Sequence, residues 1–173
     1  FGKTINFYAI AKKGSKTSPR NYELFLKKNK LPFKKINNKK YFSKNISISY
    51  KVNEEILNYF YFKKKVKKLI KNSNIDLKLG KKIKKKTLVK YDKVIISCYS
   101  ENNNILKDLD IDTKSKFRYE LVEKIIIKLS NKFKNKSFVI IDGKFVCCDP
   151  YLGTGFHLLS DVAKSKIEIV NGK

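Results

Sequence analysis

The sequence predicts a single α+β domain over residues 1–173, with a mostly antiparallel sheet and two or three packed helices. Some segments alternate apolar and polar residues with the period of a strand, and others repeat apolar residues with the period of a helix. Asp142-Gly143 joins two apolar runs, as the turn of a hairpin does. Hydrophobic residues make up 42% of the 173 residues, which is enough for one core. No internal repeat or linker divides the chain.

The first third of the chain predicts two strands and a helix. Residues 4–11 (TINFYAIA) form the first expected strand. Ser18 and Pro19 are typical of a helix start, a capping residue followed by proline in the first turn, and the helix should run to about Asn29. Residues 45–52 (NISISYKV) alternate cleanly, which predicts a half-buried strand.

A second helix is expected from Asn53, which would cap it, with Glu54 and Glu55 at its positive end. Its apolar residues recur at helical spacing, and we expect this stripe to be buried against the sheet. The stripe comprises Ile56, Tyr59, Phe62, Val66 and Leu69. Residues 87–100 should then contain one or two strands.

The last third predicts a long helix, a hairpin and two short elements. Residues 115–134 have a wide apolar face at helical spacing, so a helix is expected there. Residues 137–149 should form a hairpin whose Asp142-Gly143 turn is of type I′. A short helix over 158–165 and a strand over 166–170 follow. Asn171-Gly172 suggests a further hairpin, so the chain is expected to be an ordered portion of a longer one.

Charge is the strongest compositional signal. The chain has 41 Lys+Arg against 15 Asp+Glu, a formal net charge of +26. Codons rich in A and T favour Lys, Asn, Ile, Phe and Tyr, but the same bias raises Glu, so it does not explain the imbalance. Self-repulsion at this charge opposes a compact state unless an anion is near. A polyanionic partner is therefore expected.

Lysines cluster twice, on the second predicted helix and in the tract after it. The second cluster favours phosphate binding over the plainer alternative of a solvated helix face. We call these ten lysines the cationic ridge; with Arg118, a candidate phosphate contact near a helix start, they are the predicted RNA-binding residues. The ridge comprises Lys63, Lys64, Lys67, Lys68, Lys71, Lys81, Lys82, Lys84, Lys85 and Lys86.

The cation type indicates which polyanion is bound. Lysine suits phosphate, whereas guanine edges in duplex DNA are usually contacted by arginine, and Arg20 and Arg118 are the only arginines. No zinc-finger, basic-zipper or RNP-type pattern is present. The expected function is therefore that of a non-enzymatic ribosomal protein, bound to rRNA among the other proteins of a ribonucleoprotein. Its expected place is inside the cell on a ribosome. The A/T-biased composition suggests a mitochondrion, another organelle or a reduced bacterium, and the cytoplasm is the expected place otherwise.

A membrane surface is the weaker alternative for the basic helix. A basic amphipathic helix with aromatic residues opposite is typical of a membrane-surface segment. The apolar stripe is expected to be buried, however, and basic residues recur elsewhere, in KKGSK, KKINNKK and KSKFR. No apolar run approaches the roughly 18 residues needed to span a bilayer. No membrane partner is expected.

A small metal-independent ribonuclease is the enzymatic alternative. His157 is the sole histidine and could act as acid or base beside a lysine and Tyr151 or Thr154. A lone histidine flanked by apolar residues is more often packed, so the non-enzymatic function is preferred.

Metal and cofactor sites are not predicted. Asp108, Asp110 and Asp112 resemble the start of a calcium loop, but Thr113 and Tyr119 stand where glycine and glutamate are required. The three cysteines favour a reducing compartment. Neighbours in a predicted strand, Cys147 and Cys148 point to opposite faces and cannot readily share a metal.

Overall fold

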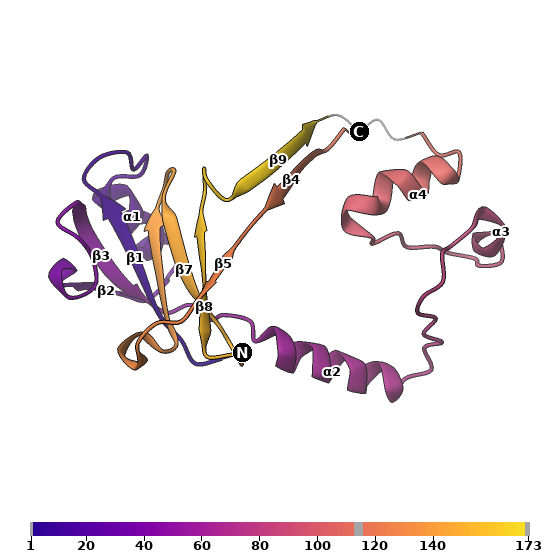
Figure 1. Cartoon of the computed structure of the whole chain (residues 1–173), viewed down its shortest axis with the longest axis horizontal. Helices are drawn as coiled ribbons and strands as arrows, with labels where there is room; N and C mark the ends of the chain where they lie inside the picture. The colour runs from indigo at the N-terminus through magenta and orange to yellow at the C-terminus, as the bar shows by residue number, and fades with distance from the viewer. Residues whose placement is uncertain (1, 113–115, 172–173) are drawn as a thin grey trace.

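A computed structural model describes residues 2–112 and 116–171 and confirms the α+β fold class (Figure 1). Its larger sheet has seven strands in the order β2-β3-β1-β6-β7-β8-β5, and β4 and β9 form a separate pair. The neighbours pair antiparallel except β1 and β6, which are parallel. The strands are β1 Ile5–Ala11, β2 Phe33–Ile36, β3 Ile46–Val52, β4 Arg118–Val122, β5 Ile125–Ile127, β6 Lys136–Ile141, β7 Val146–Tyr151, β8 Phe156–Asp161 and β9 Lys166–Asn171. The helices are α1 Pro19–Lys28, α2 Tyr59–Lys71, α3 Lys85–Leu88 and α4 Asn102–Asp108, with short 3-10 turns η1 Asn38–Lys40, η2 Tyr99–Glu101 and η3 Asn131–Phe133.

The elements predicted for the first third of the chain are confirmed. β1 and β3 form where alternation predicted strands and pair with each other, with Tyr8 opposite Tyr50. α1 begins after Ser18, whose Oγ accepts a hydrogen bond from the Asn21 amide at 3.2 Å. These signals succeed because each is local: a cap and a strand period need no distant partner to be recognised.

The core lies on both faces of β1. On one face, α1 packs over β1 and β3, with the Tyr22 and Tyr50 rings 5.3 Å apart. On the other, Phe7 stacks against Phe138 at 5.4 Å and contacts Tyr41 at 4.6 Å. Because successive strand residues point to opposite faces, one strand supports both aromatic groups.

Two tyrosines at the contact between α1 and the sheet, the half-buried Tyr22 of α1 and the buried Tyr50 of β3, should make the fold sensitive to alkali. Burial, followed by the nearby Glu54 charge, raises the pKa of Tyr22 to about 12. Burial and a 2.9 Å hydrogen bond donated to Glu23 also raise the pKa of Tyr50. Since the unfolded pKa is about 10, the unfolded state releases these protons first, and stability falls as pH rises above about 10.

The measurement is the urea midpoint of the wild type and of Tyr50→Phe at about pH 8 and about pH 11. Lysines also titrate in this range, but their contribution is common to both proteins and cancels. The wild type should lose more stability than Tyr50→Phe between the two pH values. An equal loss in both proteins would contradict a raised Tyr50 pKa.

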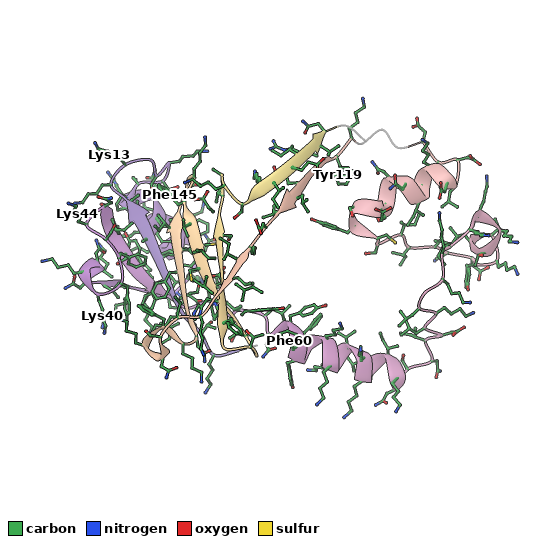
Figure 2. The ribbon with its side chains drawn as sticks, viewed as in Figure 1. Lys13, Lys40, Lys44, Phe60, Tyr119 and Phe145 are labelled. Carbon is green, nitrogen blue, oxygen red and sulfur yellow. The ribbon has the colours of Figure 1, made fainter. Side chains whose placement is uncertain are left out.

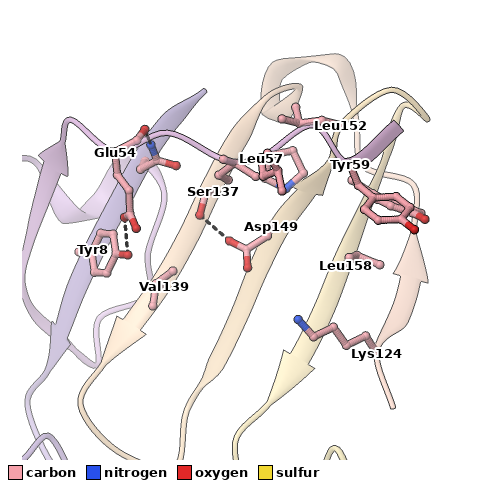
Figure 3. Close-up of a pocket in the computed structure, with 14 residues that line it drawn as sticks. Tyr8, Glu54, Leu57, Tyr59, Lys124, Ser137, Val139, Asp149, Leu152 and Leu158 are labelled. Carbon is pink, nitrogen blue, oxygen red and sulfur yellow. Dashed lines mark hydrogen bonds between the residues drawn. The ribbon is translucent and has the colours of Figure 1, made fainter. Parts of the chain in front are cut away.

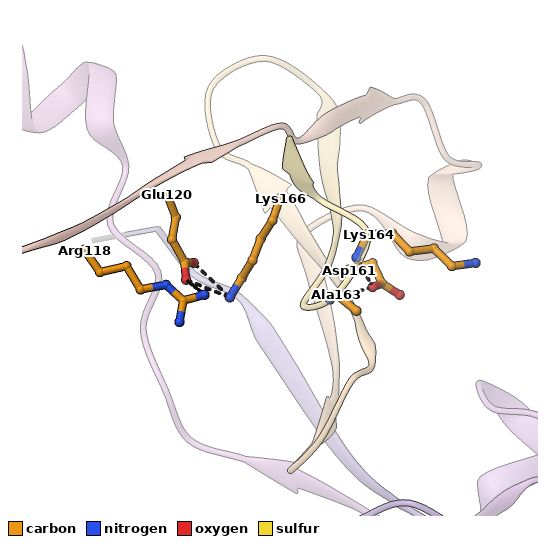
Figure 4. A network of polar contacts seen from close by, with 6 residues as sticks. All are labelled: Arg118, Glu120, Asp161, Ala163, Lys164 and Lys166. Carbon is orange, nitrogen blue, oxygen red and sulfur yellow. Dashed lines mark hydrogen bonds and ion pairs between the residues drawn. The ribbon is translucent and has the colours of Figure 1, made fainter. Parts of the chain in front are cut away.

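The helix predicted over 115–134 is wrong for the residues described from Lys116 onward. This region forms β4 and β5, which pair with β9 and β8; Tyr119 lies opposite Val170, and Ile125 opposite Leu159. Apolar spacing fits a helix, but three consecutive isoleucines favour a strand once a partner edge is available. The helix predicted over 158–165 is wrong as well, because β8 continues to Asp161 and a turn follows. In that turn the Asp161 carboxylate accepts bonds from the amides of Ala163 and Lys164 (Figure 4).

The hairpin predicted over 137–149 is confirmed, but its turn is not of type I′. β6 pairs with β7, Phe138 lying opposite Cys148, and residues 142–145 connect them. Neither Asp142 nor Gly143 has the positive φ that type I′ requires. Gly143 is needed for close approach instead, since a Cβ there would lie 2.7 Å from the Gly14 carbonyl oxygen. The loop after β1 thus packs on the hairpin turn.

Residues 57–112 form a segment that we call the arm: its first residues contact the large sheet, with the Phe60 ring 5.5 Å from the Tyr151 ring, and the rest extends away from the sheet (Figure 1). None of them is buried. α2 begins at Tyr59 after an Asn58 cap, so the start predicted at Asn53 is wrong, and the apolar stripe is not covered by the sheet. Residues 87–100 contain the end of α3 and the start of η2 rather than strands. Among the described helices, none is both long and apolar enough to cross a membrane.

Candidate nucleic-acid interface

The arm carries all ten lysines of the cationic ridge. Lys63, Lys64, Lys67, Lys68 and Lys71 lie on α2, and each is exposed. None of these five pairs with a described carboxylate. Like charges three or four residues apart oppose a helix by about 0.2–0.5 kcal/mol a pair. A bound anion would remove this repulsion.

The second half of the ridge precedes and enters α3. Lys81, Lys82, Lys84, Lys85 and Lys86 are all exposed. Lys85 forms an ion pair with Asp110, which lowers the pKa of that carboxyl group. The other four have no described carboxylate partner. The two lysine clusters therefore occupy successive segments of the arm with almost no internal neutralisation.

Arg118 lies in β4 rather than near a helix start, so that part of the prediction is wrong. Its Nη2 is 2.8 Å from Glu120, and Lys166 approaches the same carboxylate at 2.9 Å (Figure 4). Lys166, and then Arg118, lower the pKa of the Glu120 carboxyl group. Because the positive charge of Arg118 is already partly neutralised by Glu120, we expect Arg118 to be a weaker phosphate contact than the unpaired lysines.

A second group of cations, which sequence reasoning did not single out, lies on the large sheet. The Lys40 ammonium is 5.4 Å from the centre of the Tyr41 ring, and the Lys136 ammonium is 5.9 Å from the same centre. Lys132 lies 4.9 Å from the Phe133 ring in the same way. The basic segment KKINNKK is visible in the sequence. Lys132 and Lys136 are remote from it in sequence, and the pairing of β1 with β6 brings them close to it in the fold.

A surface cavity of about 570 Å³ lies beside this group. Four lysines and no carboxylate line it: Lys12, Lys35, Lys39 and Lys44. Lys40 and Lys44 project from this edge of the large sheet, far from α2 (Figure 2). Cations thus occur on both the sheet and the arm.

His157 lies in β8 and is only 4% exposed. Its Nε2 is 3.2 Å from the Phe133 carbonyl oxygen, and since a carbonyl only accepts, Nε2 carries the proton. Nδ1 is buried with no hydrogen-bond partner among the described residues. Tyr151 lines a small cavity with His157, and Thr154 donates to the Tyr151 carbonyl at 2.7 Å. The imidazole is therefore largely closed to a polymeric substrate.

Other reactive side chains within residues 2–112 and 116–171 do not converge. No group of three or more His, Cys, Asp or Glu that could hold a metal occurs among the described residues. Asp108 and Asp112 are exposed near the Lys85–Asp110 pair, while Thr113 lies outside the described residues. Cys147 and Cys148 are half-buried, and the Cys147 sulfur lies 2.8 Å from the Ser160 hydroxyl. Burial raises the pKa of Cys148, which lowers its reactivity as a nucleophile.

Comparison with known proteins gives no assignment. No protein-family model matches the chain, and no curated protein or solved structure matches it.

Proposed function

We propose that this protein is a non-enzymatic RNA-binding structural component of a ribonucleoprotein, with a ribosome as the expected assembly and rRNA as its ligand. The observation that carries the proposal is the arm, in which the cationic ridge is exposed and almost unpaired by carboxylates. Lysines of the ridge would displace counterions from RNA phosphates. The A/T-biased composition makes a mitochondrion or another organelle the expected location.

The arm needs a partner to be ordered in one conformation. Fixing the backbone of a residue costs roughly 1–2 kcal/mol, and the main compensation is burial of apolar surface. The arm has no buried residue, and large apolar side chains such as Tyr61, Leu79 and Ile95 are exposed along it. A partner with negative charge would neutralise the unpaired lysines, and one with flat apolar faces would cover the exposed apolar side chains. RNA has both properties, in its phosphates and its bases.

Neighbouring proteins of the same assembly are the second proposed partner. Parts of the arm and of the β4–β9 pair expose apolar rather than basic side chains, including Val89, Leu121 and Ile169. Exposed apolar side chains at this density are candidates for contacts with other macromolecules. An enzymatic role is not proposed, because His157 is buried and its Nε2 proton is already donated to the Phe133 carbonyl.

Binding to purified rRNA over a range of KCl concentrations tests the proposal. With six or more lysine–phosphate contacts, log Kd should rise linearly with log salt with a slope of at least about 4, taking about 0.7 per contact. Affinity should fall by about a hundredfold or more between 50 and 200 mM KCl. No binding at 50 mM KCl, or binding that is insensitive to salt, would overturn the proposal.

A further inference from the structure

A cavity of about 370 Å³ lies over the large sheet, between Tyr8 in β1 and Leu158 in β8 (Figure 3). Its floor is formed by β1, β6, β7 and β8, and the segment that leads into α2 forms a wall. Nucleotide and other small-ligand sites commonly have volumes of about 300–1,000 Å³. The cavity is therefore large enough to hold a nucleobase.

A row of polar residues crosses the floor where a packed sheet would have apolar ones. Asn6 in β1 lies opposite Ser137 in β6, and the Ser137 hydroxyl donates to Oδ1 of Asp149 in β7 at 2.6 Å. Asn6 is 1% exposed and Ser137 is 3% exposed. Asp149 lies opposite Leu158 in β8. A buried polar row costs stability relative to apolar packing, which makes it a candidate for a functional role.

The row leaves a hydrogen-bond acceptor facing the cavity. Ser137 occupies Oδ1 of Asp149, and no described donor occupies Oδ2. Glu54, the other carboxylate of the lining, likewise accepts at one oxygen, Oε2, from the Tyr8 hydroxyl at 2.5 Å, but it lies in the exposed wall and not in the buried polar row. The rings of Tyr59 and Tyr151 also line the cavity. A ligand that fits must therefore offer N–H donors to a carboxylate and a flat face to aromatic rings.

The charge of the protein selects among such ligands. At +26 the protein as a whole attracts a polyanion, and Lys124 stands in the lining beside the two carboxylates Glu54 and Asp149. Lys124 extends its ammonium group into the same space as Asp149 (Figure 3). A base at this position would leave its phosphates to Lys124 and to the solvent-exposed lysines. An unpaired base of an RNA strand meets all these conditions.

We propose that this cavity binds an unpaired guanine of RNA, with Asp149 as the specificity-determining residue. The proposal rests on the proposed function, since it assigns base selectivity to a protein that the cationic ridge would hold on RNA of any sequence. The Watson–Crick edge of guanine presents two adjacent N–H donors; Oδ2 of Asp149 would accept one, and the lone pair of Oδ1 that Ser137 does not use would accept the other. Adenine and uracil lack this pair of donors. Tyr59 would stack on the base.

The test compares 12-nucleotide uridine strands that carry one central guanine, inosine or adenine, with an all-uridine strand as reference. The wild type should bind the guanine strand about five- to hundredfold more tightly than the adenine strand, with inosine between them because it lacks the exocyclic amine. Asp149→Asn should abolish the preference and leave the all-uridine affinity within about twofold, because one guanine donor would then meet the amide NH₂. The matched control is Glu168→Gln, which makes the same change from carboxylate to amide at an exposed position of β9. It should keep the preference for guanine.

Each outcome separates this inference from the proposed function. Salt-sensitive binding of all four strands with equal affinity by the wild type would overturn the guanine site and leave the phosphate contacts standing. Loss of preference in Glu168→Gln as well as Asp149→Asn would also overturn the site.

If Asp149→Asn does not fold, Tyr59→Leu serves instead, because Tyr59 is about half exposed and lies outside the core. It should weaken binding of the guanine strand about tenfold, since stacking on an aromatic side chain contributes about 1–3 kcal/mol per base. An unchanged affinity would overturn the site.

Discussion

Replacing Lys63, Lys64, Lys67, Lys68 and Lys71 by glutamine should lower the affinity for RNA at least tenfold at 50 mM KCl. These side chains are exposed and unpaired among the described residues, so each is free to contact phosphate. If all five do, the slope of log Kd against log salt should fall by about 3.5–4.5, from five contacts at 0.7–0.9 each. Filter binding or fluorescence anisotropy over a salt series measures both quantities.

A control variant with the same loss of charge at other positions tests whether the effect depends on where the lysines lie. Glutamine at Lys27, Lys28, Lys34, Lys51 and Lys164, all exposed and outside the arm, also reduces the formal charge from +26 to +21. It should change the slope by less than 2, because these lysines belong to neither lysine cluster of the ridge. The α2 variant should keep its helix content by circular dichroism, since the changes remove repulsive pairs. Equal loss of affinity in both variants would show that net charge alone, and not the ridge, binds RNA.

Phe7→Ala should destabilise the sheet by about 3–5 kcal/mol, a large part of the stability of a small domain. Phe7 is 4% exposed and lies between Tyr41 and Phe138, so its loss leaves a cavity in the aromatic face of β1. Urea unfolding monitored by circular dichroism checks the value.

Phe62→Ala is the matched change in the arm. Phe62 lies in α2 and is 48% exposed, so its truncation should change the unfolding free energy by less than about 0.5 kcal/mol. The same variant should retain the urea midpoint of the wild type in the absence of RNA. A large effect at Phe62 would mean that the apolar stripe is buried in the free protein, in disagreement with the exposed arm.

The sequence predicted elements well where the signals are local and poorly where a distant partner decides. The Ser18 cap, the alternation of β3 and the apolar runs of the β6–β7 hairpin are complete within a few residues, and each prediction was correct. The helix prediction failed over residues 116–134 because pairing with β8 and β9 outweighs an apolar spacing that also suits a helix. The parallel pairing of β1 with β6 could not be predicted from hydrophobic pattern, since residues of the two strands are far apart in sequence.

The candidate site divides in the same way. The ridge lysines are consecutive or nearly so, and their exposure follows from charge and helical spacing. The polar row of Asn6, Ser137 and Asp149 carried no signal, because each residue is ordinary within its own segment. Only strand order brings these three side chains together. Base selectivity would therefore depend on the part of the fold that the sequence pattern leaves undetermined.

The arm lies between two strands of the chain, β3, which ends at Val52 in the large sheet, and β4, which begins at Arg118 and pairs with β9. Closing a flexible segment costs entropy that grows only with the logarithm of its length, about 0.6 kcal/mol for each doubling. Lengthening or shortening of this segment is therefore nearly neutral for the fold. Insertions and deletions among natural variants should accumulate here, so that its reach can adapt to different architectures while the strands stay constant.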